Sequence, residues 1–474
     1  MMHTVEKIGG TSMSSFNEVL DNIIFYPQSL YQRIFVVSAY SGITNGLLEC
    51  KKTGKPGIYQ AVADHDPQWQ QQLAQLKDRM LLINHDMFSD PMARRQADHF
   101  IIERLEKAQS CIQNILDTCQ FRQFSLAGYL PQIREFLSSI GEAHSAFNTA
   151  LLLSLHKVNA RFVDLSGWDS ERSGNLDEVL TQAMADIDLS QELPIVTGYV
   201  SCDEGLMQTY DRGYSEMTFS RLAVLTGAKE AVIHKEYHLS SADPGIVGAD
   251  AVSPIGHTNY DVADQLANLG MEAIHPNAAA GLRKAGINLV IKNTFEPEHA
   301  GTRITQSYQP TQDKVDIIAG KNHICALHIF DQTMVGKIDN ISYQIIEIIR
   351  QERVQVVGKE MNANSMTYYL SGHEKAQKKV LKKVEALFPL GHISAEMVAL
   401  ISVIGAQIDQ NSILYNAIIA LNQQGILPQA MHTPLRNVDV QFVVADKDYD
   451  ATIRTLHQAL MEQTPVCLQS VKVA

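Results

Sequence analysis

KIGGTS, at residues 7–12, lies at the end of a short strand pattern whose apolar positions are Val5 and Ile8. The two adjacent glycines allow a tight turn in which several backbone N–H groups can point at one anion, and the Thr–Ser pair can supply hydroxyls or cap a following helix. The lysine precedes the glycines, unlike the lysine of a Walker A loop, so it would reach a phosphate from the strand side. We interpret the segment as a phosphate-binding turn. A strand-to-helix turn that binds no ligand is the alternative.

Strand patterns alternate with helical patterns as far as residue 304, which predicts βα units around a mostly parallel sheet. The strand patterns are RIFVVSAY at residues 33–40, ARFVDLS at 160–166, LPIVTGYVS at 193–201 and EAVIHK at 230–235. Residues 67–120 are polar and carry Leu, Ile and Met at helical spacing, so we expect a mostly helical insertion. We therefore predict an α/β domain over residues 1–305.

The pattern changes after the polar segment QSYQPTQDK, and we interpret residues 306–314 as a linker. Residues 315–395 show strands and helices typical of a small α+β module, and residues 396–474 repeat that order with weak similarity. Each module is too short to bury a large core alone, so we expect the two to pair.

The composition excludes several classes of protein. The 474 residues carry a net charge of −13 and 45% hydrophobic residues, which is typical of a globular protein of two or three domains and argues against a nucleic-acid binder. No run approaches the roughly 18 apolar residues of a membrane-spanning helix, and the first residues do not resemble a signal peptide, so we expect a cytoplasmic protein without membrane contact. The six cysteines lack C-x-x-C spacing and no H-E-x-x-H pair occurs, so we predict no metal ligands.

Polar residues at predicted strand ends and helix starts are candidates for binding. In SAYSGITN, Ser38 and Thr44 follow a strand, where open α/β sheets bind ligands. SIGEAHS places Glu142 at the predicted start of an apolar helical run, where an acid could also serve only as a helix-dipole partner. DRGYSE places Arg212 and Ser215 in a turn before a helix, and an arginine there suits bidentate recognition of a carboxylate. A solvated surface turn is the alternative for DRGYSE.

Taken in order, these motifs resemble those of aspartate kinases. The resemblance covers essentially the whole chain and rests on KIGGTS, VVSAYSGITN, SIGE, DRGYSE, ADPGIV, EAIHPNAA and NTFEPEHAGTRI. The two small modules resemble the paired ACT domains of those enzymes, and KIGGTSM with GYSEMTF is most similar to the branch associated with ectoine synthesis. The resemblance implies an amino-acid-kinase fold that uses ATP and Mg²⁺ to phosphorylate the β-carboxylate of L-aspartate. The product, 4-phospho-L-aspartate, begins aspartate-family amino acid or ectoine biosynthesis.

The resemblance also implies a role for each matching residue. Lys7 would contact the transferring phosphates, Glu142 would hold the substrate ammonium and Arg212 would hold the α-carboxylate. The implied catalytic positions are Lys7, Gly9, Gly10, Arg212 and Glu216. The implied substrate-binding positions are Ser38, Ala39, Thr44, Glu142, Arg212 and Ser215. The implied nucleotide-binding positions are Lys7, Gly10, Ser12, His234, Lys235, Ser240 and Asp243. The β-carboxylate, with a reference pKa of about 3.9, is ionised at neutral pH and needs no general base.

The chain departs from the family pattern mainly on the nucleotide side. Glu216 stands in place of the usual aspartate, and His234 with Lys235 in place of the usual Thr–Asp pair. These departures motivate a catalytically impaired amino-acid sensor as an alternative. Another kinase of this fold, acting on acetylglutamate, glutamate, carbamate or UMP, is a further alternative, but the families of those kinases lack the paired ACT modules and the GE and HP segments. The ACT-like modules predict a homodimer, and both a regulatory role and a dimerisation scaffold are open. The loops at residues 331–338 and 406–413 lack the Pro-Gly step common in effector-binding ACT loops, so we expect no feedback control by lysine or threonine.

Overall fold

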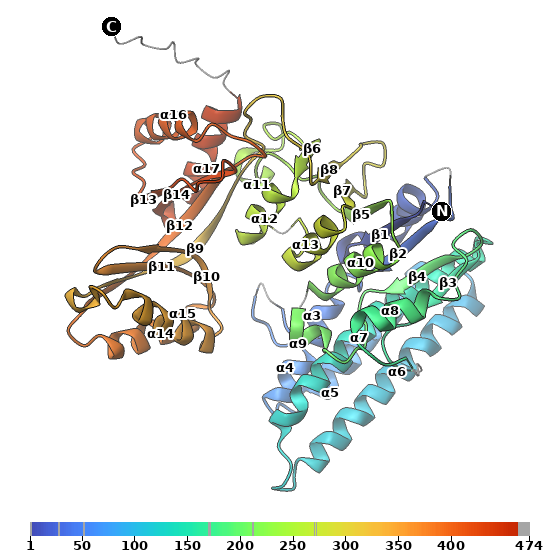
Figure 1. Cartoon of the computed structure of the whole chain (residues 1–474). Helices are drawn as coiled ribbons and strands as arrows, with labels where there is room; N and C mark the ends of the chain where they lie inside the picture. The colour runs from blue at the N-terminus through green and yellow to red at the C-terminus, as the bar shows by residue number, and fades with distance from the viewer. Residues whose placement is uncertain are drawn as a thin grey trace. The chain divides into compact units, whose positions relative to one another are not determined.

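The computed structural model describes residues 2–26, 29–50, 53–168, 172–210, 213–269, 271 and 273–462 (Figure 1). The chain packs into two compact units. The first comprises Met1–Leu239 with Ile274–Gln306, and the second comprises Ser240–Ala273 with Ser307–Ala474. The predicted order, an α/β unit followed by α+β modules, is confirmed. Within the part of the chain that the structure describes, no helix has the length and apolar character needed to cross a membrane.

A mostly parallel sheet forms the centre of the first unit. The strands that the first unit contributes lie in the order β3 (Ala160–Val163), β4 (Leu193–Thr197), β2 (Arg33–Val37), β1 (Thr4–Ile8), β5 (Glu230–Lys235), β7 (Asn288–Asn293) and β8 (Thr302–Thr305). All neighbouring pairs are parallel except β7 with β8. Every residue of β2 and β4 is buried, as expected of a parallel sheet covered on both faces.

Twelve helical segments of the described part accompany this sheet in the first unit. They are α1 (Gly10–Met13), α2 (Phe16–Val19), η1 (Leu20–Ile24), α3 (Ile43–Leu47), α4 (Ile58–Ala63), α5 (Trp69–Met87), α6 (Pro91–Thr118), α7 (Leu126–Leu155), α8 (Leu176–Met184), α9 (Leu206–Tyr210), α10 (Tyr214–Leu225) and α13 (Pro276–Lys284).

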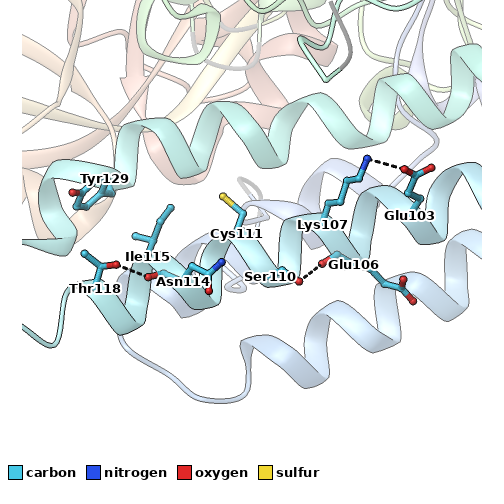
Figure 2. A pocket seen from close by; sticks show the side chains of 9 residues that line it. All are labelled: Glu103, Glu106, Lys107, Ser110, Cys111, Asn114, Ile115, Thr118 and Tyr129. Atoms are coloured by element: carbon cyan, nitrogen blue, oxygen red, sulfur yellow. Dashed lines mark hydrogen bonds and ion pairs between the residues drawn. The ribbon is translucent and has the colours of Figure 1, made fainter.

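Helices α5 and α6 occupy most of residues 67–120 and pack beside α7, as the helical spacing of that segment predicted (Figure 1). A surface groove runs along α6 and is lined by Glu103, Glu106, Lys107, Ser110, Cys111, Asn114, Ile115, Thr118 and Tyr129 (Figure 2). None of the candidate site residues lines this groove.

The second unit is built on an antiparallel sheet. Its strands lie in the order β10 (Gln355–Met361), β11 (Ser365–Ser371), β9 (Ile317–Phe330), β12 (His392–Ile404), β14 (Asp439–Ala445) and β13 (Ala430–His432). Its other elements are α11 (Pro244–Val247), β6 (His257–Asn259), α12 (Tyr260–Asn268), η3 (Gln332–Met334), α14 (Ile338–Gln351), α15 (Glu374–Leu387), α16 (Gln410–Gln423), η4 (Asp446–Asp448), α17 (Tyr449–His457) and η5 (Gln458–Glu462).

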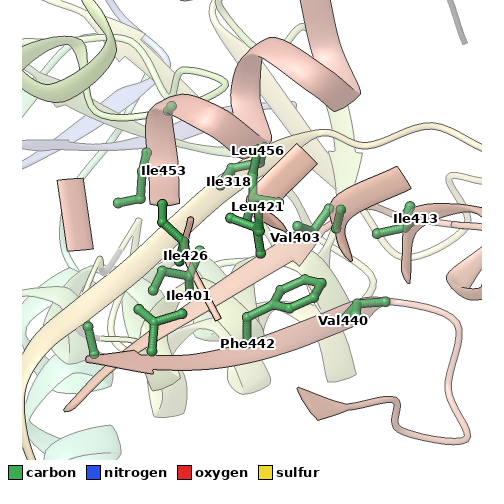
Figure 3. Packing of buried hydrophobic residues seen from close by; sticks show 14 of the residues in the cluster. Ile318, Ile401, Val403, Ile413, Leu421, Ile426, Val440, Phe442, Ile453 and Leu456 are labelled. Atoms are coloured by element: carbon green, nitrogen blue, oxygen red, sulfur yellow. The ribbon is translucent and has the colours of Figure 1, made fainter. Parts of the chain in front are cut away.

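Two hydrophobic cores share the long strands β9 and β12. Leu327, from the second half of β9, packs in one core with α14 and α15. Ile318, from the first half, packs in the other with Ile401, Phe442 and Leu456 (Figure 3). The core of Ile318 therefore combines residues that precede the core of Leu327 in the chain with residues that follow it. One module is thus inserted into the other.

The compact units differ from the sequence-based boundaries in one further way. Residues 240–273 belong to the second unit, where Ala242 is buried in the same hydrophobic core as Ile318. The division into a catalytic domain at 1–305, a linker at 306–314 and ACT-like domains at 315–395 and 396–474 stays a prediction. Periodicity along one segment cannot reveal which of two cores its apolar face will join.

Candidate active site

The KIGGTS segment forms the turn between β1 and α1. Gly9 precedes α1, and its N–H donates to the carbonyl oxygen of His234 at 3.1 Å. A Cβ atom on Gly10 would lie 2.6 Å from the carbonyl oxygen of Ala39, so a glycine is needed where the two chain segments approach so closely. The predicted strand-to-helix turn is therefore present, at the carboxyl end of a central parallel strand, where such sheets bind ligands.

Lys7 and Glu216 form an ion pair beside this turn. The Nζ atom of Lys7 lies 3.6 Å from Oε1 of Glu216, and their side chains are 9% and 16% exposed. The other carboxylate oxygen of Glu216 accepts a hydrogen bond from the backbone N–H of His275, the residue that caps α13. Glu216, in the first turn of α10, therefore links the buried lysine to the start of another helix.

Glu142 faces the same region from α7. Its Oε1 atom accepts a hydrogen bond of 3.0 Å from the hydroxyl of Ser215, and the residue is 2% exposed. Its Oε2 atom is buried and has no hydrogen-bond partner among the described residues. Burial raises the pKa of Glu142 to about 8, although the Ser215 hydrogen bond and the charge of Lys7 oppose that shift. A buried carboxylate oxygen without a partner is costly, and a ligand cation would satisfy it.

The sequence-based position of Glu142 in its helix was wrong. The prediction placed Glu142 at a helix start, but α7 runs from Leu126 to Leu155 and Glu142 lies near its middle. Pro131 stands inside α7 without ending it, whereas a proline in a helical pattern normally indicates a boundary. The helix dipole therefore does not explain the position of this carboxylate.

Gly198, directly after β4, is a site residue that the sequence analysis missed. A Cβ atom there would lie 2.9 Å from Oε2 of Glu142 and 2.7 Å from Cβ of Ser215. Only a glycine leaves room for both side chains at the end of this strand. The signal that could have identified it is a glycine immediately after a fully buried strand pattern.

The segment after β2 connects these elements. Ser38 donates its N–H to the carbonyl oxygen of Ile8 at 3.2 Å, and its own carbonyl accepts the Ser145 hydroxyl of α7 at 2.9 Å. Ala39 is buried, and Thr44 lies in the first turn of α3. Ser38 and Ala39 are therefore held against both the glycine turn and the helix that carries Glu142.

The structure does not bring all the predicted nucleotide residues together. Ser12 is fully buried and its hydroxyl accepts a hydrogen bond from Thr294. The ring of His234 lies 2.8 Å from a carboxylate oxygen of Glu6, and Lys235 accepts the Thr294 N–H at its carbonyl.

Three further predicted positions cannot be placed in this site. Ser240 and Asp243 belong to the second compact unit, where Asp243 caps α11 through the N–H of Gly245. Arg212 lies outside the described residues. The roles assigned to these residues stay predictions.

The site thus combines a buried cation, a turn of backbone amides and a buried carboxylate whose Oε2 atom has no hydrogen-bond partner among the described residues. These groups can hold an anion beside an ammonium ion. The described residues contain no group of three or more His, Cys, Asp or Glu side chains that could hold a metal ion.

Comparison with known proteins identifies the family. The model of the amino acid kinase family matches residues 2–293. This protein belongs to the amino acid kinase family. Across 466 residues this family member is 49% identical to the aspartate kinase Ask_Ect of Stutzerimonas stutzeri (strain A1501), covering 97% of this chain and 98% of that protein. It is 25% identical to the chloroplastic aspartokinase 1 of Arabidopsis thaliana, covering 97% of this chain and 80% of that protein.

Solved structures agree on the fold. Aspartokinase III of E. coli in complex with lysine and aspartate superposes with a TM-score of 0.73 at 17% identity, covering 97% of this chain and 99% of that chain. The form of that enzyme with aspartate and ADP gives a TM-score of 0.72 at 19% identity, covering 97% and 99%. The family, the fold and the resemblance to aspartate kinases predicted from the sequence are confirmed.

Proposed function

We propose that this amino acid kinase is an aspartate kinase, which transfers the γ-phosphoryl group of ATP to the β-carboxylate of L-aspartate and yields 4-phospho-L-aspartate. The observation that carries the proposal is the unpartnered Oε2 atom of Glu142, buried beside Ser215 and near the charge of Lys7. The high identity to a named aspartate kinase over nearly the whole chain supports it.

On the amino-acid side, the residues bind and orient rather than transfer protons. Glu142 receives the substrate ammonium at Oε2, and the Ser215 hydroxyl fixes the other carboxylate oxygen. We assign the α-carboxylate to Arg212, whose planar guanidinium suits bidentate binding. The β-carboxylate is already ionised at neutral pH, so this site supplies proximity and charge stabilisation without a general base.

On the nucleotide side, Lys7 and the backbone N–H of Gly10 in the glycine turn face developing negative charge on the transferring phosphoryl group, while the N–H of Gly9 is held by the carbonyl of His234. Glu216 fixes the lysine side chain through their ion pair. Mg²⁺ is expected to arrive with ATP and neutralise phosphate charge, since this ion is usually held by substrate phosphates and one or two carboxylates. Glu216, which pairs with Lys7, is a carboxylate that could contribute.

We place the reaction at the first step of aspartate-family amino acid or ectoine biosynthesis. The name of the relative Ask_Ect supports the ectoine branch. We also propose a homodimer through the second unit, because α14 exposes Tyr343 and Ile346, which are 72% and 42% exposed. The cytoplasmic location stays a prediction.

A coupled assay for ADP release tests the function. ADP release should require L-aspartate, and hydroxylamine in the reaction should trap the acyl phosphate as aspartyl hydroxamate. Glutamate, acetylglutamate and carbamate serve as controls for the other kinases of this fold. Binding of aspartate without ADP release would favour the sensor alternative, and ADP release without hydroxamate would contradict phosphorylation of a carboxylate.

A further inference from the structure

Three buried polar side chains meet on one face of the first sheet. Glu6 lies in β1, Arg33 begins β2 and His234 lies near the end of β5, and none is more than 6% exposed. Side chains alternate between the two faces along a strand, so Glu6 points away from the face that carries Lys7. The cluster of Glu6, Arg33 and His234 therefore lies on the side of β1 opposite the candidate site.

Arg33 holds the carboxylate of Glu6 through two bonds. Its Nε and Nη2 atoms donate to the two oxygens of Glu6 at 2.6 and 2.9 Å. The guanidinium also donates to the carbonyl oxygens of Ile23 and Ile24, at 2.7 and 3.0 Å. Burial alone would raise the pKa of Glu6, but the charge of Arg33 and the hydrogen bonds from His234 and Arg33 hold it well below its usual range. The carboxylate of Glu6, on β1, is therefore an anion that Arg33 of the neighbouring strand β2 holds in place.

His234 connects this anion to the phosphate-binding turn. Its Nε2 atom lies 2.8 Å from Oε2 of Glu6. Its backbone carbonyl accepts the N–H of Gly9 at 3.1 Å, and the parallel register pairs His234 with Ile8, the residue before Gly9. One residue thus binds β1 through its ring and the start of the glycine turn through its backbone.

We propose that Glu6 and His234 are positioning residues for the phosphate-binding turn. The ring of His234, fixed on Glu6, keeps the end of β5 in register with β1, so that its carbonyl holds the Gly9 N–H and sets the direction of the turn. Their side chains do not touch the nucleotide. The kinetic part of this inference rests on the proposed kinase function. The positioning role stands in place of the direct contact between the His234 side chain and the nucleotide that the sequence predicted.

The test compares three substitutions of His234. His234→Leu has similar bulk without a donor, His234→Gln keeps a side-chain N–H at a similar reach, and His234→Asn is polar but one methylene shorter. A hydrogen bond to a charged group is worth roughly a tenfold change in an equilibrium constant. We therefore expect Leu and Asn to raise KM for ATP about tenfold and Gln to restore most of that loss. KM for aspartate should stay within about twofold.

Two readouts distinguish positioning from other roles. Inhibition by adenosine, which lacks phosphates, should be unchanged in all three variants, whereas weaker inhibition would indicate a contact with the base and overturn the proposal. A purely structural role would lower the melting temperature in one of two ways. Either KM for both substrates would rise together, or neither KM would change. If the Leu variant fails to fold, the Gln and Asn pair still decides, and an unchanged KM for ATP in both would overturn the proposal.

Calorimetric titration of MgATP without aspartate separates this inference from the proposed function. Weaker MgATP binding in the Leu and Asn variants supports positioning even if the parent protein does not phosphorylate aspartate. Absence of aspartate turnover with normal MgATP binding would reject the aspartate kinase assignment alone. Equal MgATP affinity in the parent and in every variant would reject the positioning role alone.

Discussion

The pH dependence of aspartate affinity follows from the burial of Glu142. Its pKa in the ligand-free protein is raised to about 8, so near pH 7 the carboxyl is mostly protonated. The substrate ammonium needs the ionised form, and binding must therefore release a proton. At about pH 7 this costs roughly 1.4 kcal/mol, or tenfold in affinity, and near pH 6 it costs about a hundredfold.

The sign and size of the effect can be measured directly. The fraction of protein with ionised Glu142 rises from about one-hundredth near pH 6 to about half near pH 8, so KM for aspartate should fall about fiftyfold across that interval. The β-carboxylate, with a reference pKa of about 3.9, does not titrate there. KM for ATP provides the internal control. Calorimetry in buffers of different ionisation enthalpy should detect release of about nine-tenths of a proton per aspartate near pH 7.

Two variants identify the titrating group. Glu142→Gln should bind aspartate weakly and with no such pH dependence. Glu135→Gln is the matched control, since Glu135 lies two turns earlier on α7, where it accepts a hydrogen bond from the Tyr199 hydroxyl. This control variant should keep the pH dependence of KM for aspartate. A flat KM for aspartate in the parent protein, or an unchanged slope in Glu142→Gln, would refute the reasoning.

Four further outcomes are expected. Lys7→Met should lower kcat by on the order of 10²–10³ with an unchanged circular dichroism spectrum, because the cation acts chiefly on charge in the transition state; a kcat above half the parent value would contradict its role. Gly198→Ala should raise KM for aspartate at least about tenfold, because the new methyl group would crowd the unpartnered Oε2 atom of Glu142, whereas Gly128→Ala, in open space, should leave KM unchanged; equal effects of the two would reject the steric argument. Deletion from Asp313 onward should give a monomeric, poorly soluble protein, because Ala242 and the residues around it would lose their core, and a soluble dimer in size-exclusion chromatography would show an interface in the first unit. Millimolar lysine or threonine should leave ADP release nearly unchanged, and loss of more than half the activity would show feedback control.

The sequence by itself determined the features that are local in the chain. The adjacent glycines after an apolar strand in KIGGTS predicted the turn between β1 and α1, because close backbone approach requires residues without a Cβ atom. Apolar runs that alternate with segments of helical spacing predicted a mostly parallel sheet and the helical insertion. The spacing of apolar residues, and hence the buried face, can be read from each segment by itself. The order of the motifs was enough to identify the family.

Tertiary structure alone decided which side chains meet. His234 follows the same strand pattern whether its ring faces a nucleotide or Glu6, and only the pairing of β1 with β2 and β5 settles its neighbour. The need for glycine at position 198 depends on Glu142 and Ser215, which come from two helices remote in the chain. The two cores of the second unit divide β9 between them, which no repeat in the sequence reveals. Contacts between distant segments depend on strand order and register, and a single sequence specifies these only through the packing of the whole fold.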